Sequence, residues 1–507
     1  MADLTLAVLR RDGDAFTEAL TREHYLAASG HKPNADLQSI YKRFAHILGP
    51  AALELTRDAF RSSTPNSEEW RSARALLDWQ VEAYASRELA ELDERVIAWE
   101  AGAVVRLPDG GEVPYQRAAV DMSTEPNRQK RLALDEARAA LVGRELAPMR
   151  GERLQRERDL IESLEIASDY ISSFEALSGI DLRGLATECE RFLRETESMW
   201  ADVHSAAVKR QLGIAPGEAT RADALAMMRA PQFDPYFPAS EMEPAVKRQV
   251  SDMGSDPTAG GRITYDLAPR PGKRSRAFCA PVRVPREIYL VLLPYGGATD
   301  YRTFLHELGH SLHFAFMRDD LPFEFRCLGD NSITEGFAML FDHLMHDPGW
   351  LGRYSALGRP RVPEYRRAAA FEELQFLRRY CAKLLYELRL YGGDISWSSL
   401  PDAYVDILST ATTFRYRAAD AFIDVDPRFY SARYLRAWQL QASLRDVLVA
   451  QFDEDWFRNP RTGPWMEREL FGEGQRELAS EMAERVGAKT LSFDPVIRAI
   501  EAGLTAS

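Results

Sequence analysis

The chain has only four cysteines in 507 residues, and no two of them form a C-x-x-C pair. Small secreted proteins that depend on disulfides carry many more, and thiolate zinc sites need closely spaced pairs. The sequence therefore argues against a disulfide framework and against a thiolate zinc site. We expect reduced, mostly packed thiols at all four positions, which are Cys189, Cys279, Cys327 and Cys381.

Long apolar runs and an excess of positive charge are also missing. No stretch of about 18 apolar residues occurs, and residues 1–20 lack the basic and apolar regions of a signal peptide. Lys and Arg number 64 against 77 Asp and Glu, which gives a net charge of −13. This balance argues against nucleic acid and anionic membranes as partners. We expect a cytoplasmic protein, either a monomer or a homo-oligomer.

Most of the chain carries a helical pattern. Long segments with a period near 3.6 residues fill much of 33–205 and return after about residue 300. Asp109-Gly110-Gly111 is a turn signal that predicts a small hairpin within the first helical region. Residues 230–300 are rich in Pro and Gly and contain the best strand candidate, Ile288 to Leu293. The predicted fold is mostly α, with a small β-sheet before the next helix.

That next helix contains the motif FLHELGHSLH, residues 304–313, which holds three of the nine histidines. Asp300 or Thr299 is the expected N-cap of a helix that runs to about Met317. At about 100° per residue the three histidines fall within an arc of about 60°, and apolar residues occupy the other side. The pattern predicts a helix with one imidazole-rich face.

His306 and His310 are one turn apart, so their ring nitrogens can bind one tetrahedral zinc ion. Zinc lowers the pKa of a water molecule towards about 7, and Glu307 can take its proton as the water attacks a carbonyl carbon. The alternative is histidines that face solvent or are satisfied in the core. His313 is expected to pack beside the ligands and support them rather than to bind the metal.

A catalytic zinc ion needs a third protein ligand and one open position. Glu335 is the best candidate, and Asp342 lies on the same stripe of the next helical pattern. Asp342 would accept a hydrogen bond from a ligating imidazole, unless it is simply a surface carboxylate. The alternative for Glu335 is a capping box with Ser332, which matches S-x-x-E. The histidines at 343 and 346 are expected to be ordinary helix residues.

FLHELGHSLH and ITEGFAMLFDHL together resemble two blocks of the thimet oligopeptidase and oligoendopeptidase F metallopeptidases, which are gluzincins. The resemblance extends upstream to GKRSRAFC and YLVLLPYGGATDY, and it is strongest over about 270–350. It implies a helical, ellipsoidal peptidase with a deep central channel that admits short unstructured peptides. Residues 1–205 would form one wall of that channel, and residues 206–507 would form the catalytic region.

Carried over residue by residue, the resemblance implies that His306, His310 and Glu335 bind one Zn²⁺ per chain and that Glu307 is the general base. The implied activity is hydrolysis of internal bonds in short oligopeptides.

The strand at Ala277, Phe278 and Cys279 would bind the substrate backbone by strand addition, unless it is only a core strand. Arg276 stands where the family's strand motif usually has Gly.

The segment DPRFYSARYLRAW is similar to a family segment whose His and Tyr side chains stabilise the oxyanion. Tyr430 and Tyr434 match two tyrosine positions, but a third position is Ala437 and no histidine follows His346. The alternative is a core aromatic stripe of Tyr430, Tyr434 and Trp438.

Two further functions remain open from the sequence. A zinc carboxypeptidase on a similar scaffold would need a cation for the terminal carboxylate, and Arg276 or Arg274 is the candidate. A non-catalytic zinc-binding or peptide-binding relative would explain the missing histidine, although a purely structural zinc site does not require Glu307.

Overall fold

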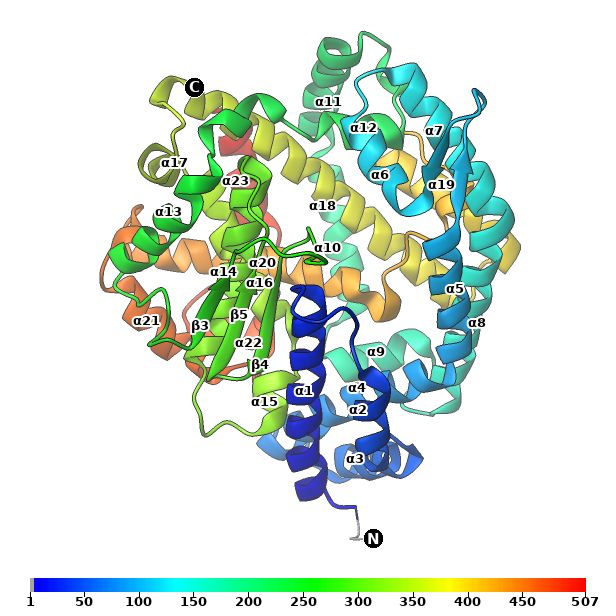
Figure 1. Ribbon diagram of the computed structural model, residues 1–507, viewed down its shortest axis with the longest axis vertical. Helices are drawn as coiled ribbons and strands as arrows, with labels where there is room; N and C mark the ends of the chain where they lie inside the picture. The colour runs from blue at the N-terminus through cyan, green and yellow to red at the C-terminus, as the bar shows by residue number, and fades with distance from the viewer. Residues whose placement is uncertain (1–3) are drawn as a thin grey trace. The chain divides into compact units, whose positions relative to one another are not determined.

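The computed structural model describes residues 4–507 and is mostly helical, with two small β-sheets (Figure 1). The chain forms two compact units. Unit 1 contains the described residues up to Tyr84 together with Pro231–Arg366 and Arg436–Ser507, and unit 2 contains Ala85–Ala230 and Arg367–Leu435. Across residues 4–507, every helix is too short or too polar to span a lipid bilayer.

The sequence predicts a channel wall formed by residues 1–205 and a catalytic region formed by residues 206–507. Both roles stay predictions. The compact units follow another division, because the start, middle and end of the chain pack together in unit 1.

Unit 1 holds the candidate site. Its elements are α1 (Leu6–Ala28), α2 (Leu37–Arg43), α3 (Pro50–Ser62), α13 (Ala239–Asp252), β3 (Ile263–Asp266), β4 (Phe278–Arg283), β5 (Glu287–Val291), α14 (Ala298–Phe316), α15 (Phe323–Cys327), α16 (Asn331–Asp342), α17 (Pro348–Tyr354), α21 (Thr462–Glu469), α22 (Ala479–Arg485) and α23 (Asp494–Leu504).

Unit 2 is built from helices and one hairpin. Its elements are α5 (Ala90–Gly102), β1 (Val104–Arg106), β2 (Glu112–Pro114), α6 (Tyr115–Thr124), α7 (Arg128–Leu141), α8 (Ala147–Ser163), α9 (Tyr170–Ser178), α10 (Leu182–Glu195), α11 (Glu197–Leu212), α12 (Arg221–Met227) and α19 (Leu400–Thr412). Three helices run across unit boundaries, namely α4 (Glu68–Glu88), α18 (Val362–Gly392) and α20 (Tyr430–Phe452).

The predicted hairpin is confirmed. β1 and β2 pair antiparallel, and the turn between them contains Gly110 with φ of 87°. Glycine adopts this left-handed conformation without the steric cost that a side chain would add.

The predicted small sheet is also confirmed, with β5 covering most of Ile288 to Leu293. Its strand order is β3-β5-β4, with β3 parallel and β4 antiparallel to β5. Side chains of β4 alternate between the faces: Ala280 packs with Tyr25 of α1, whereas Cys279 contacts Ser311 of α14. α1 and α14 thus cover opposite faces, and β4 is an edge strand (Figure 1).

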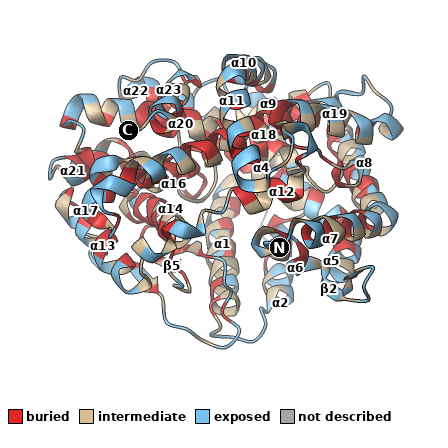
Figure 2. Ribbon diagram, turned by 90° about the horizontal axis from the view of Figure 1, so that it is seen from above, coloured by how far each residue is buried: buried red, intermediate tan, exposed pale blue. Residues whose placement is uncertain are grey.

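α14 and α16 pack closely enough for their backbones to touch. A Cβ atom added at Gly309 would lie 2.6 Å from the Cα atom of Ala338, so no larger residue fits there without a shift. Buried residues extend along both helices (Figure 2). This close approach places the histidine face of α14 opposite Glu335 of α16.

The start of α14 differs from the prediction, although its end does not. The N-cap is Gly297, with φ of 96°, rather than Thr299 or Asp300. The Asp300 carboxylate instead accepts hydrogen bonds from the backbone N–H groups of the two residues before Gly297, at 2.7 and 2.8 Å. It therefore fixes the glycine turn that leads into the helix. The helix ends at Phe316 with Met317 as its C-cap, which agrees with the predicted end at about Met317.

Candidate metal centre

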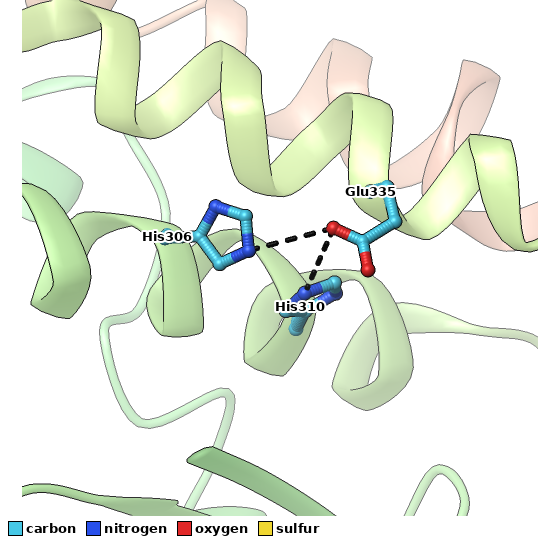
Figure 3. A group of neighbouring side chains, drawn as sticks. All are labelled: His306, His310 and Glu335. Carbon is cyan, nitrogen blue, oxygen red and sulfur yellow. Dashed lines mark ion pairs between the residues drawn. The ribbon is translucent and has the colours of Figure 1, made fainter. Parts of the chain in front are cut away.

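His306, His310 and Glu335 form a group that can hold a metal ion, hereafter the metal group. One ligand atom from each lies within 4.8 Å of the other two. The Nε2 atom of His306 lies 3.5 Å from Oε2 of Glu335, and Nε2 of His310 lies 3.8 Å from the same oxygen (Figure 3). Within residues 4–507, no other cluster of three or more His, Cys, Asp or Glu side chains is arranged in this way.

The two separations that involve Glu335 are close to those of a zinc site. Ligand atoms about 2.0 to 2.2 Å from a tetrahedral ion lie roughly 3.3 to 3.5 Å from one another. The observed 3.5 and 3.8 Å are close to that geometry. The His306 side chain remains 23% exposed, so solvent can reach this histidine. Two imidazoles and a carboxylate also suit other divalent transition metals, so the donors alone do not identify the ion.

The environment of His306 favours a cation. Its Nδ1 atom lies 2.9 Å from Oδ2 of Asp342, and because a carboxylate only accepts, Nδ1 carries the hydrogen. In the neutral imidazole the Nε2 lone pair then faces the carboxylate oxygen of Glu335, which is repulsive unless a cation lies between them. Burial lowers the pKa of His306, but the hydrogen bonds with Asp342 and Glu335 outweigh it and raise the pKa to about 10.

The hydrogen bond that Asp342 was expected to accept from an imidazole is therefore present, and the Asp342 side chain is only 14% exposed. Its other oxygen accepts from Nδ1 of His343 at 2.6 Å. Burial raises the pKa of Asp342, but His343 and His306 together hold that pKa well below its usual range. His343 thus has a contact at the site that the sequence did not predict.

His310 is oriented by Thr334, which the sequence also did not predict. Its Nδ1 atom lies 2.8 Å from the Thr334 hydroxyl oxygen, which leaves Nε2 facing Glu335. Burial lowers the pKa of His310 to about 4, so its imidazole is neutral near pH 7. Neutral imidazole is the form that binds metals. The only sequence signal for Thr334 was its position directly before Glu335.

The capping-box alternative for Glu335 is wrong. The N-cap of α16 is Asp330, whose side chain accepts a hydrogen bond from the backbone N–H of Ser332 at 2.9 Å. Ser332 lies inside the first turn, so it is not the capping residue that the box requires. Glu335 is buried and faces the two histidines.

Glu307 follows His306 in α14 and contacts strand β4 of the sheet. Its carboxylate accepts a hydrogen bond from the backbone N–H of Cys279 in the edge strand β4. Burial raises the pKa of Glu307, and the charge of His306, the Cys279 hydrogen bond and the charge of Arg276 offset this only in part. A carboxylate with a raised pKa is a stronger base at neutral pH.

His313 has its contacts elsewhere. It is fully buried, its ring lies 4.9 Å from that of Phe337, and its Nε2 donates to the Gly474 carbonyl oxygen at 3.3 Å. Burial lowers its pKa to about 3, so the ring is neutral. His313 packs as expected, and Phe471 and Gly474 cover this turn of α14. Its support of the metal ligands stays a prediction.

The predicted substrate strand lies beside the metal group, within unit 1. Ala277 precedes β4, Phe278 points to the α1 face, and Cys279 points to the α14 face. Burial raises the pKa of the Cys279 thiol well above its usual value, so it stays protonated. Whether this strand binds substrate stays a prediction.

Tyr430 and Tyr434 lie at the start of α20, in the part that belongs to unit 2. Their rings are 5.0 Å apart in an edge-to-face arrangement, and Tyr380 of α18 lies 5.7 Å from Tyr434. The metal group belongs to unit 1. Their expected role at an oxyanion therefore stays a prediction.

Comparisons with protein-family models and with curated proteins found no match for this chain.

Proposed function

We propose that the protein is a zinc metallopeptidase of the thimet oligopeptidase and oligoendopeptidase F type, which hydrolyses internal peptide bonds of short oligopeptides. The observation that carries this proposal is the metal group together with Glu307. The donors supply a metal site, and Glu307 supplies a base next to it. A site that only stabilises the fold would not need that base.

In this proposal the chain's own residues divide the work. His306, His310 and Glu335 hold the ion, while Asp342 and Thr334 fix the orientation of the two imidazoles. Zinc supplies a Lewis acid that polarises the carbonyl group and lowers the pKa of a water molecule. Glu307 accepts a proton from the attacking water and then gives it to the amine nitrogen as the carbon–nitrogen bond breaks.

The peptide would lie in an extended conformation against β4. An edge strand has unpaired backbone groups that can bind another strand, and β4 is joined to the sheet only through β5. The Cys279 N–H that donates to Glu307 belongs to this strand, so a peptide on β4 would pass close to the base. Tyr430 and Tyr434 are proposed as phenol donors to the oxyanion, following the family resemblance.

The experiment is cleavage of a mixed peptide library by the full chain loaded with one equivalent of zinc, read by mass spectrometry. Internal cleavage is expected, and it should stop when a chelator removes the metal. Glu307→Gln should retain zinc and lower the rate by about 10²-fold to 10⁴-fold.

Two other outcomes would overturn the proposal. If the zinc-loaded protein cleaves no peptide while Glu307→Gln binds peptides as tightly as the wild type, the protein is a binding protein. Exclusive removal of single C-terminal residues would instead identify a carboxypeptidase.

A further inference from the structure

A cationic loop leads into β4. Its sequence, RPGKRSR at residues 270–276, has four basic side chains among seven residues in a chain whose net charge is −13. Arg270 and Lys273 are used within the fold, whereas Arg274 and Arg276 are exposed and form no ion pair with any residue of the described part of the chain. An exposed arginine that the fold leaves without an ion pair can bind an anionic ligand.

The loop is held firmly in place. The buried Lys273 donates from Nζ to the backbone carbonyls of Asp266 at 2.7 Å and Ala268 at 3.0 Å, and it also contacts the Asp266 carboxylate at 3.1 Å. Arg270 donates to the carbonyl of Ser29 at 2.8 Å. The backbone N–H of Arg274 donates to the carbonyl at the end of α1, at 2.8 Å. The exposed arginines therefore project from a fixed base.

Arg276 and Arg274 act on different neighbours. Arg276 lies three residues before Cys279, whose N–H binds Glu307, and three residues of extended chain span at most about 10 Å. The charge of Arg276 reaches the Glu307 carboxylate, whereas that of Arg274 acts on His24 of α1. Of the two arginines, Arg276 is thus the one whose field reaches the proposed base.

We propose that Arg276 is a specificity-determining residue that binds a carboxylate of the substrate. The preferred substrates are peptides that carry a carboxylate within about three residues of the bond that is cleaved, since each residue of an extended peptide spans about 3.4 Å. The inference rests on the proposed function. A guanidinium group binds a carboxylate through two parallel hydrogen bonds, and here it offsets the repulsion that an acidic protein exerts on an acidic peptide.

The carboxylate can come from the peptide's C-terminus or from an Asp or Glu side chain. Two pairs of otherwise identical peptides distinguish these sources. One pair compares a free C-terminus with its amide, and the other compares an internal Asp with Asn in C-terminally amidated peptides. The zinc-loaded full chain should cleave the carboxylate member of at least one pair with a kcat/KM about tenfold higher. Most of the difference should lie in KM, and it should shrink as salt is raised.

Arg276→Gln should reduce that ratio to about one, and Arg276→Lys should restore part of it. Arg274→Gln removes the same charge from the same loop and is the matched control, which should keep the wild-type ratio. A wild-type ratio near one in both pairs, or equal effects of the two glutamine variants, would overturn the role of Arg276 while leaving the peptidase intact. Failure to cleave any peptide would instead overturn the proposed function, and the role of Arg276 with it.

Discussion

The Nδ1 atom of His306 lies 2.9 Å from the Asp342 carboxylate, while its Nε2 atom lies 3.5 Å from that of Glu335. The imidazole therefore lies between two carboxylates. Asp342 accepts the hydrogen on Nδ1, and Glu335 lies on the Nε2 side, where a metal ion would bind. In the proposed zinc site this arrangement orients the ring and increases its basicity, because the partner of Nδ1 accepts the hydrogen.

Asp342→Asn should weaken zinc binding by about 10-fold to 100-fold, since the neutral amide is a poorer acceptor for the Nδ1 hydrogen. Competition with a chromophoric chelator measures the affinity. Asp330→Asn is the control, because that carboxylate caps the same helix at its other end and does not contact the histidines. Unchanged affinity in Asp342→Asn would mean that the hydrogen bond does not tune the metal site.

Gly309→Ala should separate α14 from α16 and weaken zinc binding by at least about tenfold. The new methyl group would meet the backbone of α16, with Ala338 Cα and Phe337 O both at 2.6 Å, and backbone cannot move aside as a side chain can. Overpacking of this kind costs about 1 to 3 kcal/mol.

Gly336→Ala is the matched control for this change. The methyl group there would meet the flexible side chain of Leu440, with its nearest atom at 2.7 Å. This variant should lose stability without an equal loss of zinc affinity, as measured by chelator competition and denaturant unfolding. Equal effects of both substitutions on zinc affinity would contradict the assigned role of the α14–α16 contact.

His204 should make unit 2 sensitive to acid. Burial, together with the charge of Arg378, lowers its pKa to about 4, whereas an unfolded histidine titrates near 6.5. Below pH 6.5 the unfolded chain binds a proton that the folded chain excludes, so stability is lost as the pH falls from 6.5 to 4. The loss from this one group approaches about 3 kcal/mol.

His204→Phe keeps an aromatic ring between Trp200 and Phe414 and removes the titration. The difference between its urea midpoint of unfolding and that of the wild type should therefore rise in favour of the variant as the pH falls from 7 to 4. A difference that does not change with pH would show that folding does not lower the pKa of His204.

Features set by local periodicity could be predicted from the sequence. The i, i+4 spacing predicted that His306 and His310 lie one turn apart on the same face of a helix. The same helical period predicted that Glu335 and Asp342 lie on one face of the next helix. The hairpin at Gly110 followed from its turn residues. Each of these depends on neighbours within a few residues, which the sequence displays directly.

Features that depend on distant contacts could not be predicted. His313 lies on the same helix face as His310, but the sequence does not show that Phe471 and Gly474 cover that turn. The contact of Thr334 with His310 depends on how α14 meets α16. The hydrogen bonds that Asp300 accepts from the preceding glycine turn likewise depend on a loop conformation that periodicity does not describe.

The most direct test of the metal site is the zinc content of the protein, measured by mass spectrometry of the elements after zinc loading and gel filtration. The wild type and Glu307→Gln should each retain one zinc ion per chain, because Glu307 is not a ligand, whereas Glu335→Ala and His306→Ala should retain none. Absence of zinc from the wild type, or one full equivalent in Glu335→Ala, would contradict a site built from His306, His310 and Glu335.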